Sequence, residues 1–375
     1  YGVKVDQAWL DRVRGASVRL TSGCSASLVS KEGLVLTNHH CVVHCVQQLS
    51  TAEKDFVKDG FLTATRAEER KCSGMQAEVL ETITDQTRAV NAATAGKTGQ
   101  AFVAARDAAT ARAEDAACGK DDKVRCQVVS LYRGGQYKLY RYRKYDDVRL
   151  VFAPELATAF FGGDPDNFNF PRFNLDMAFL RLYEGGKPVV SPSHLIWQAR
   201  APRADEPVFV SGNPGSTARL MTVAQLETQR DLVIPVDLLQ RSELRGRLIR
   251  FSEESAEYKR IATAPLFGQE NGFKVFFGRQ FALNGKELMD AKRTAEADLR
   301  AKVAADPKLA AEIGDPRGEI AKIQGAYADN FVRYRQVEAS AGSLSDLYDY
   351  ARKLVRAAQG RANPSADRLP GHSAG

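Results

Sequence analysis

Six cysteines, all between Cys24 and Cys126 of this 375-residue chain, constrain its fold more than any other feature. Paired in sequence order, they give three candidate disulfides: Cys24 with Cys41, Cys45 with Cys72, and Cys118 with Cys126. In an oxidising compartment these cysteines would form disulfides, whereas in a reducing one they would be free thiols or metal ligands. The residues between the first two cysteines favour disulfides.

Residues 16–41 predict a short β-hairpin, because they are rich in strand-forming residues and contain a turn at Lys31-Glu32-Gly33. Glycine in the third position of such a turn suits a bulged hairpin. The two arms would bring Cys24 and Cys41 together, and closing a loop of this size stabilises a fold by about 3 kcal/mol. The hairpin ends at two adjacent histidines, His39 and His40.

The composition is that of a globular protein with two or three domains, since 44% of the residues are hydrophobic and 26% are charged. The net charge of +7 is modest and spread along the chain, so it does not require a nucleic-acid partner. The sequence has no apolar run of about 18 residues that would span a bilayer. Because it begins with Tyr1, we expect that a leader or N-terminal segment has been removed by processing or lost by truncation.

The pattern of hydrophobic residues predicts a β-rich part followed by a helical part. Strand signals recur at residues 127–132, 137–142, 148–152, 177–183 and 208–211. The alanine-rich stretch 97–118 predicts a helix that interrupts these strands. From about residue 226 the pattern is helical, with helices expected at 285–305, 317–339 and 343–358. The segment from Gly360 lacks apolar periodicity and is expected not to fold.

The first candidate catalytic group is His40, which follows an apolar strand and precedes Cys41. A disulfide next to the imidazole would fix its backbone, and an unperturbed pKa of about 6.5 suits a general base. One alternative is that both histidines merely end a strand at the surface. Another is a zinc site made of His40, Cys41, His44 and Cys45, although a single turn cannot easily wrap four ligands around a tetrahedral ion.

The second candidate is Asp176, an acid at the entrance to the apolar strand 177–183. If it met the imidazole of His40, it would hold the tautomer of that ring and stabilise the imidazolium during acyl transfer. Taken alone, it would be a turn residue or a solvated charge. A histidine followed by an aspartate is the order found in trypsin-like serine peptidases. The long separation between them fits a helical insertion in a surface loop.

The third candidate is the loop 160–172, a dense alternation of glycine, Asp or Asn, and aromatic residues. Its glycines permit close backbone approach, and asparagine side-chain oxygens can accept hydrogen bonds from an ammonium group. Composition alone would favour an ordinary packed turn.

Together these motifs resemble the bacterial dipeptidyl-peptidase 7 and 11 family of serine exopeptidases. The resemblance covers most of residues 16–290 and rests on 23–27, 37–41, 59–61, 161–172 and 212–219. It implies a double β-barrel catalytic domain with a helical domain inserted between the barrels, which caps the cleft and admits only peptide N-termini.

The fold class that follows is β plus α, in three parts. A first trypsin-like β-barrel, incomplete as a catalytic domain, is expected over residues 1–225 with a helical insertion near 85–126. The start of an inserted all-α domain is expected over 226–359, and a disordered tail over 360–375.

The resemblance also implies a function, a serine-type dipeptidyl-peptidase that releases N-terminal dipeptides from peptides through a Ser-His-Asp triad without a cofactor or metal. It assigns His40 as the general base and Asp176 as the orienting acid. Asn167 resembles the residue that holds the substrate's α-ammonium, and Phe168 stands where the family usually has tryptophan. Asn271 resembles a second ammonium-binding asparagine, donated by the helical domain. The pair before Asp176, residues 173–174, departs from many members.

The nucleophilic serine is expected outside this chain, because family members are roughly twice as long and carry it near the C-terminus. Ser216 is not a candidate, since Pro214 stands at the nucleophile's place in its motif. We therefore expect the 375-residue chain alone to be inactive. The alternative is a catalytically dead peptide-binding pseudo-peptidase. The resemblance further suggests a homodimer at a periplasmic or cell-surface site.

A further alternative is nucleic-acid binding through residues 137–145, where basic and aromatic residues alternate. Such alternation is more typical of an amphipathic strand.

Overall fold

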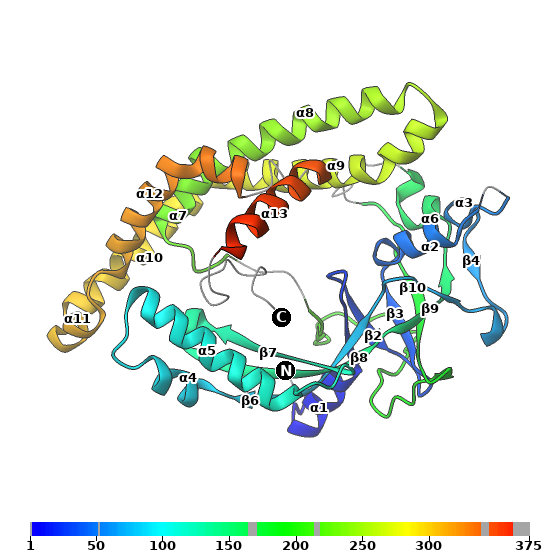
Figure 1. Cartoon of the computed structure of the whole chain (residues 1–375), viewed down its shortest axis with the longest axis horizontal. Helices are drawn as coiled ribbons and strands as arrows, with labels where there is room; N and C mark the ends of the chain where they lie inside the picture. The colour runs from blue at the N-terminus through cyan, green and yellow to red at the C-terminus, as the bar shows by residue number, and fades with distance from the viewer. Residues whose placement is uncertain (1, 52, 164–170, 214–217, 339–344, 363–375) are drawn as a thin grey trace. The chain divides into compact units, whose positions relative to one another are not determined.

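An antiparallel sheet dominates the first part of the chain, and helices make up the second (Figure 1). The computed structural model describes residues 2–51, 53–163, 171–213, 218–338 and 345–362. The chain separates into two compact units, Tyr1–Ser216 and Thr217–Gly375. This organisation confirms the β plus α class, while the domain boundaries predicted from the sequence stay predictions.

The described strands of the first unit form one antiparallel sheet in the order β4-β9-β10-β3-β2-β1-β6-β8-β7, with β11 beside β10 and β5 beside β9. The first six strands are β1 (Ser17–Leu20), β2 (Ser25–Leu28), β3 (Leu34–Thr37), β4 (Phe61–Leu62), β5 (Arg70–Lys71) and β6 (Ala77–Asp85). The others are β7 (Val124–Leu131), β8 (Gln136–Tyr145), β9 (Asp147–Ala153), β10 (Ala178–Glu184) and β11 (Lys187–Pro188). The strands predicted at 127–132, 137–142, 148–152 and 177–183 are therefore confirmed as β7 to β10.

The sheet curls around one apolar core. Side chains alternate between buried and half-buried along β1, β2 and β3, the period-two pattern of a sheet with one inner face. The inner face contributes side chains with no exposed area: Val18, Leu20, Val35, Leu150, Leu180 and Leu182. Only Asp146 separates β8 from β9, and Arg143 of β8 forms an ion pair with Glu184 of β10. The curled sheet thus brings β8 close to β10, although these two strands are not neighbours in the sheet order.

The predicted hairpin is present, and Gly33 explains its turn. Gly33 has a φ of +65°, a conformation that side chains other than glycine rarely adopt. A Cβ there would also lie 3.0 Å from the carbonyl oxygen of Leu182 and 3.1 Å from that of Val189. The turn therefore needs glycine both for its backbone and for its contact with β10.

All three disulfides predicted in sequence order are formed: Cys24–Cys41, Cys45–Cys72 and Cys118–Cys126. The first joins the loop before β2 to the turn after β3. The third ties the end of helix α5 (Gly99–Cys118) to β7.

The helix predicted over residues 97–118 is confirmed. Helices α4 (Thr87–Thr94) and α5 (Gly99–Cys118) lie between β6 and β7 in the chain, beside the strands they interrupt (Figure 1). They share a small core in which Val90, Ala109 and Tyr137 are buried. The two inserted helices thus have their own apolar contacts, as an insertion between two sheet strands requires.

The prediction of a strand at residues 208–211 is wrong, because the chain there is irregular. Val208 and Val210 are 67% and 97% exposed. β-branched alternation forms a strand only where a neighbour completes the hydrogen-bond ladder, and no described strand pairs with this segment. Its end is attached by a side chain instead, since the backbone N–H of Asn213 donates to Ser25 Oγ at 2.6 Å.

The described residues of the second unit form helices joined by short connections, with no strand among them. Its helices are α7 (Val223–Thr228), α8 (Ile234–Ser252), α9 (Ala256–Asn284), α10 (Lys286–Ala304), α11 (Pro307–Ile313), α12 (Pro316–Val337) and α13 (Asp346–Arg361). The helices predicted at 285–305, 317–339 and 343–358 are confirmed as α10, α12 and α13. The tail beyond residue 362 lies outside the described residues. None of the described helices has the length and apolar character needed to cross a bilayer.

A buried acid, Glu69, is expected to contribute strongly to the stability of the sheet. Its carboxylate accepts from Arg181 Nε at 2.9 Å and from the Tyr183 hydroxyl at 2.8 Å, and its side chain is 2% exposed. Glu69→Ala should lower the free energy of unfolding by about 3–5 kcal/mol, because it leaves a buried guanidinium and hydroxyl without their partner. Urea denaturation of the two chains measures the difference.

The control is Glu184→Ala, which removes an exposed carboxylate that also pairs with basic side chains. Solvent screens such a pair, so a much smaller loss of stability is expected. Equal losses in the two variants would show that burial of Glu69 is not the cause.

Candidate active site

The structure explains how His40 is held. Strand β3 ends at Thr37, and residues His39–Cys41 form a 3-10 turn that leads into helix α2 (Val43–Leu49). Val42, Cys45 and Val46 anchor this helix in the apolar core. The turn is fixed on its other side by the Cys24–Cys41 disulfide. His40 therefore projects from a backbone that is fastened before and after it.

Asp176 reaches His40 because of how two strands pair. Strands β10 and β3 are antiparallel, with Ala178 of β10 opposite Thr37 of β3. The residues just before β10 consequently lie beside the residues just after β3. Asp176 and His40 are distant in sequence, yet the pairing of β10 with β3 brings them to the same end of these two strands.

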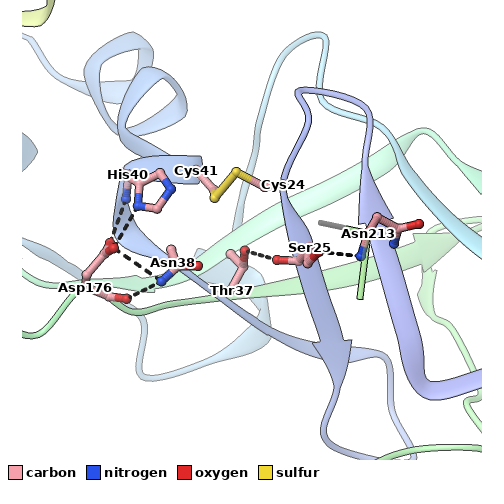
Figure 2. The surroundings of a disulfide bond; sticks show 8 residues. All are labelled: Cys24, Ser25, Thr37, Asn38, His40, Cys41, Asp176 and Asn213. Carbon is pink, nitrogen blue, oxygen red and sulfur yellow. Dashed lines mark hydrogen bonds and ion pairs between the residues drawn. A yellow bond between two sulfur atoms is a disulfide. The ribbon is translucent and has the colours of Figure 1, made fainter. Parts of the chain in front are cut away.

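The two side chains form a close pair (Figure 2). His40 Nδ1 lies 2.7 Å from Asp176 Oδ2, and the backbone N–H of His40 donates to Asp176 Oδ1 at 3.0 Å. A proton on Nδ1 directed at the carboxylate leaves Nε2 as the acceptor of the neutral ring. His40 is 62% exposed at its side chain, whereas Asp176 is 25% exposed. Such a pair can take a proton from a nucleophile and return it.

The disulfide beside the imidazole bears on the zinc alternative. The sulfurs of Cys24 and Cys41 and a ring nitrogen of His40 lie within 4.8 Å of one another. Both sulfurs are bonded to each other, and Cys45 is likewise bonded to Cys72. The cysteines of the proposed zinc cluster are therefore engaged as disulfides and offer no thiolate, which favours the general-base interpretation.

Of the three residues predicted to bind substrate, the structure describes one, Asn271. Asn167, Phe168 and also Ser216 lie outside the described residues. Asn271 lies in α9 of the helical unit. The roles predicted for Asn167, Phe168 and Asn271 stay predictions.

One residue at the site was missed by the sequence interpretation. The side-chain amide of Asn38 donates to both the carboxylate and the main-chain oxygen of Asp176. The available signal was a lone amide between the end of an apolar strand and the histidines. Nothing in the sequence indicates which group such an amide meets.

The environment shifts the pKa values of the three ionisable groups in different directions. The hydrogen bond to Asp176 raises the pKa of His40 above 6.5, although partial burial opposes it. Burial alone would raise the pKa of Asp176, but hydrogen bonds from the ring and backbone of His40 outweigh it and hold that pKa below 3.8. Burial lowers the pKa of His39 below 6.5, more than the Asp176 charge raises it.

The adjacent histidines should therefore titrate on opposite sides of 6.5, His40 above and His39 below. NMR titration of histidine-labelled chain measures this, with His39→Gln and His40→Gln variants to assign the signals. The raised His40 pKa means that its stabilising contribution is complete below 6.5 and is lost as the pH rises through the folded-state pKa. The contribution of Asp176 is present above 3.8 and is lost as the pH falls through its lowered pKa. Two indistinguishable titrations would contradict the geometry.

Comparisons with known proteins agree with the motifs in the sequence. The sequence model of one family, described as Peptidase S46, matches residues 1–374. An Asp/Glu-specific dipeptidyl-peptidase from Shewanella putrefaciens is 28% identical over 363 residues, which cover 93% of this chain and 48% of that protein. Dipeptidyl-peptidase 7 from Phocaeicola vulgatus is 27% identical over 296 residues, 74% of this chain and 41% of that protein. The chain spans about half the length of the curated relatives it matches.

Solved structures show the same fold. The crystal structure of Porphyromonas endodontalis DPP11 in complex with substrate matches with a TM-score of 0.73 and 22% identity, over 94% of this chain and 56% of that one. The same protein in complex with the dipeptide Arg-Asp matches with a TM-score of 0.72 and 23% identity, over 90% and 51%. The resemblance recognised in the sequence is confirmed, and the chain belongs to the peptidase S46 family.

Proposed function

We propose that the protein of which this chain forms part is a serine-type dipeptidyl-peptidase, with His40 as general base and Asp176 as its orienting acid. The observation that carries the proposal is the 2.7 Å contact between His40 Nδ1 and Asp176 Oδ2, which leaves Nε2, unbonded to any described residue, as the acceptor of the neutral ring. The S46 family match and the dipeptidyl-peptidase names of the relatives support it.

The nucleophilic serine is proposed to come from a part of the longer protein outside this chain. No serine hydroxyl in the described ranges is hydrogen-bonded to Nε2 of His40. The serine oxygen would attack the peptide carbonyl while its proton passes to this nitrogen, which then protonates the leaving amine. Water would hydrolyse the acyl-enzyme by the same route, releasing the dipeptide.

The substrate is proposed to be a peptide with a free N-terminus. Asn167 and Asn271 would accept hydrogen bonds from its α-ammonium, and Phe168 would contact the N-terminal residue. The two curated relatives carry different names, one of them Asp/Glu-specific, so the proposal extends to dipeptide release and not to the preferred side chain.

A periplasmic or cell-surface location is proposed from the three disulfides, since such bonds persist in oxidising compartments. A homodimer is proposed from the family resemblance.

A second candidate is a peptide-binding pseudo-peptidase that keeps the base and the acid without a nucleophile. The observation that favours it is the same absence of a described serine at Nε2 of His40. Its distinguishing property is binding of peptides without release of dipeptides by the longer protein.

The test is dipeptide release from fluorogenic dipeptide substrates by the full-length parent protein. Release by the parent, and none by the 375-residue chain, is expected. The matched control is the same substrate with an acetylated N-terminus, which removes the α-ammonium and should not be cleaved. A folded parent that binds peptides but releases nothing would overturn the peptidase proposal and support the second candidate.

A further inference from the structure

Asn38 holds Asp176 at two points (Figure 2). Its Nδ2 donates to the main-chain oxygen of Asp176 at 3.0 Å and to Oδ2 of the carboxylate at 3.2 Å. An asparagine amide carries two hydrogens, so one group can make both bonds. We propose that Asn38 is a positioning residue for the pair formed by His40 and Asp176. The inference rests on the proposed catalytic role of His40.

Asp176 needs such support because it lies outside the sheet. The ladder between β10 and β3 begins at Ala178, and residues 172–177 are irregular. Within this segment Leu175 N donates to Thr158 O at 2.9 Å, which fastens the chain before Asp176. Among the described residues, only Asn38 donates a hydrogen bond to the main-chain oxygen of Asp176. The backbone at the acid is therefore held from the side by a side chain.

The same amide also fixes the plane of the carboxylate. Oδ1 accepts from the backbone N–H of His40, while Oδ2 accepts from both the His40 ring and Asn38. A carboxylate with one donor can rotate about its side-chain torsions, whereas donors at both oxygens define one rotamer. The ring bond of His40 thus meets an acceptor whose direction is already set by other donors.

The direction of the Asn38 side chain is informative in itself. Asn38 precedes a 3-10 turn, in the position where asparagine usually accepts a hydrogen bond from the first N–H groups of its own helix. Its side chain makes no such capping bond here. Although Asn38 is exposed, its amide points neither to its own turn nor only to solvent, but to Asp176.

Few charged groups act on the ring that the experiment observes. The carboxylate of Asp176 approaches His40 from the segment before β10. On the same turn, His39 is 2% exposed. Asn38 itself carries no charge. A change in the titration of His40 after replacing Asn38 therefore reports on the contact with Asp176.

The experiment is an NMR titration of His40 in the histidine-labelled 375-residue chain, which does not depend on activity. Asn38→Ala is expected to lower the pKa of His40 by part of the drop that Asp176→Asn causes, because the carboxylate loses its fixed direction. In the Asp176→Asn background, Asn38→Ala should have no further effect, since Asn38 acts through the acid. Asn38→Ser, whose shorter donor cannot reach both oxygens, serves if the alanine variant does not fold.

The matched control is Gln48→Ala, which removes another exposed amide that hydrogen-bonds a histidine, His44, at 3.0 Å. It should leave the titration of His40 unchanged. A pKa of His40 that is unchanged or raised in Asn38→Ala would overturn the inference, as would an equal drop in the Asp176→Asn background. A pKa of His39 that stays below that of His40 shows that the turn is intact.

A kinetic measurement on the longer protein separates this inference from the proposed function. There Asn38→Ala should lower kcat about tenfold with little change in KM, the effect of one hydrogen bond that matters in the transition state. If the NMR results are as expected while the longer protein releases no dipeptide, the positioning role stands and the proposed function fails. An unchanged kcat in an active longer protein would overturn the positioning role instead.

Discussion

His40→Ala in the longer protein is expected to lower kcat for dipeptide release by about 10⁴- to 10⁶-fold, the range found when the base of a serine triad is removed. Without the imidazole of His40, the site loses the exposed ring that takes the serine proton and returns it to the leaving amine. Steady-state cleavage of a fluorogenic dipeptide substrate measures the loss. KM should change far less, because the ring acts in the transition state.

The control is His44→Ala, which removes an exposed imidazole one turn further along, on α2, where it hydrogen-bonds Gln48. Cleavage by this variant should equal that of the unaltered protein. If His40→Ala kept full activity, the catalytic assignment would fail and a peptide-binding role would become the better explanation.

Asp176→Asn is expected to lower kcat by about 10⁴-fold while the protein stays folded. If the amide oxygen keeps the bond from the backbone N–H of His40, the NH2 group faces Nδ1 of the ring, so the variant favours the wrong ring tautomer and loses the bond of 2.7 Å. The pH profile gives a second readout. Because the base must be neutral, kcat/KM of the unaltered protein should rise with pH through a midpoint above 6.5, and Asp176→Asn should shift that midpoint downward.

Asp147→Asn provides the matched control, since its carboxylate on β9 pairs with Arg149 at 2.8 Å and has no bond to His40. Its pH profile should be that of the unaltered protein. A midpoint for Asp176→Asn that is equal to or above that of the unaltered protein would show that Asp176 does not set the basicity of the ring.

The sequence predicted those parts of the site that depend only on residues close together in the chain. These parts are the glycine in the hairpin turn, the pairing of cysteines that are neighbours in the sequence, and the position of His40 next to Cys41 after an apolar strand. The meeting with Asp176 required a family resemblance, because it depends on a ladder between strands far apart in the chain. Local patterns do not specify which strands become neighbours.

The missed and mistaken features have the same origin. Asn38 is an ordinary strand-end residue until the acid is beside it, so its partner could not be read from neighbouring residues. The segment 208–211 has the alternation of a strand, yet no described strand pairs with it and it stays irregular. In both cases a tertiary partner, present or absent, decides what the local sequence does.

The arrangement of the disulfides has a consequence for how the chain acquires them. The bonded pairs span residues 24–41, 45–72 and 118–126, and these loops neither overlap nor enclose one another. A polypeptide that enters an oxidising compartment from its N-terminus exposes each cysteine's correct partner as the next thiol to arrive. Oxidation in the order of arrival then gives the native pairing, so folding of this chain in an oxidising compartment should not depend on an isomerase that reshuffles wrong bonds.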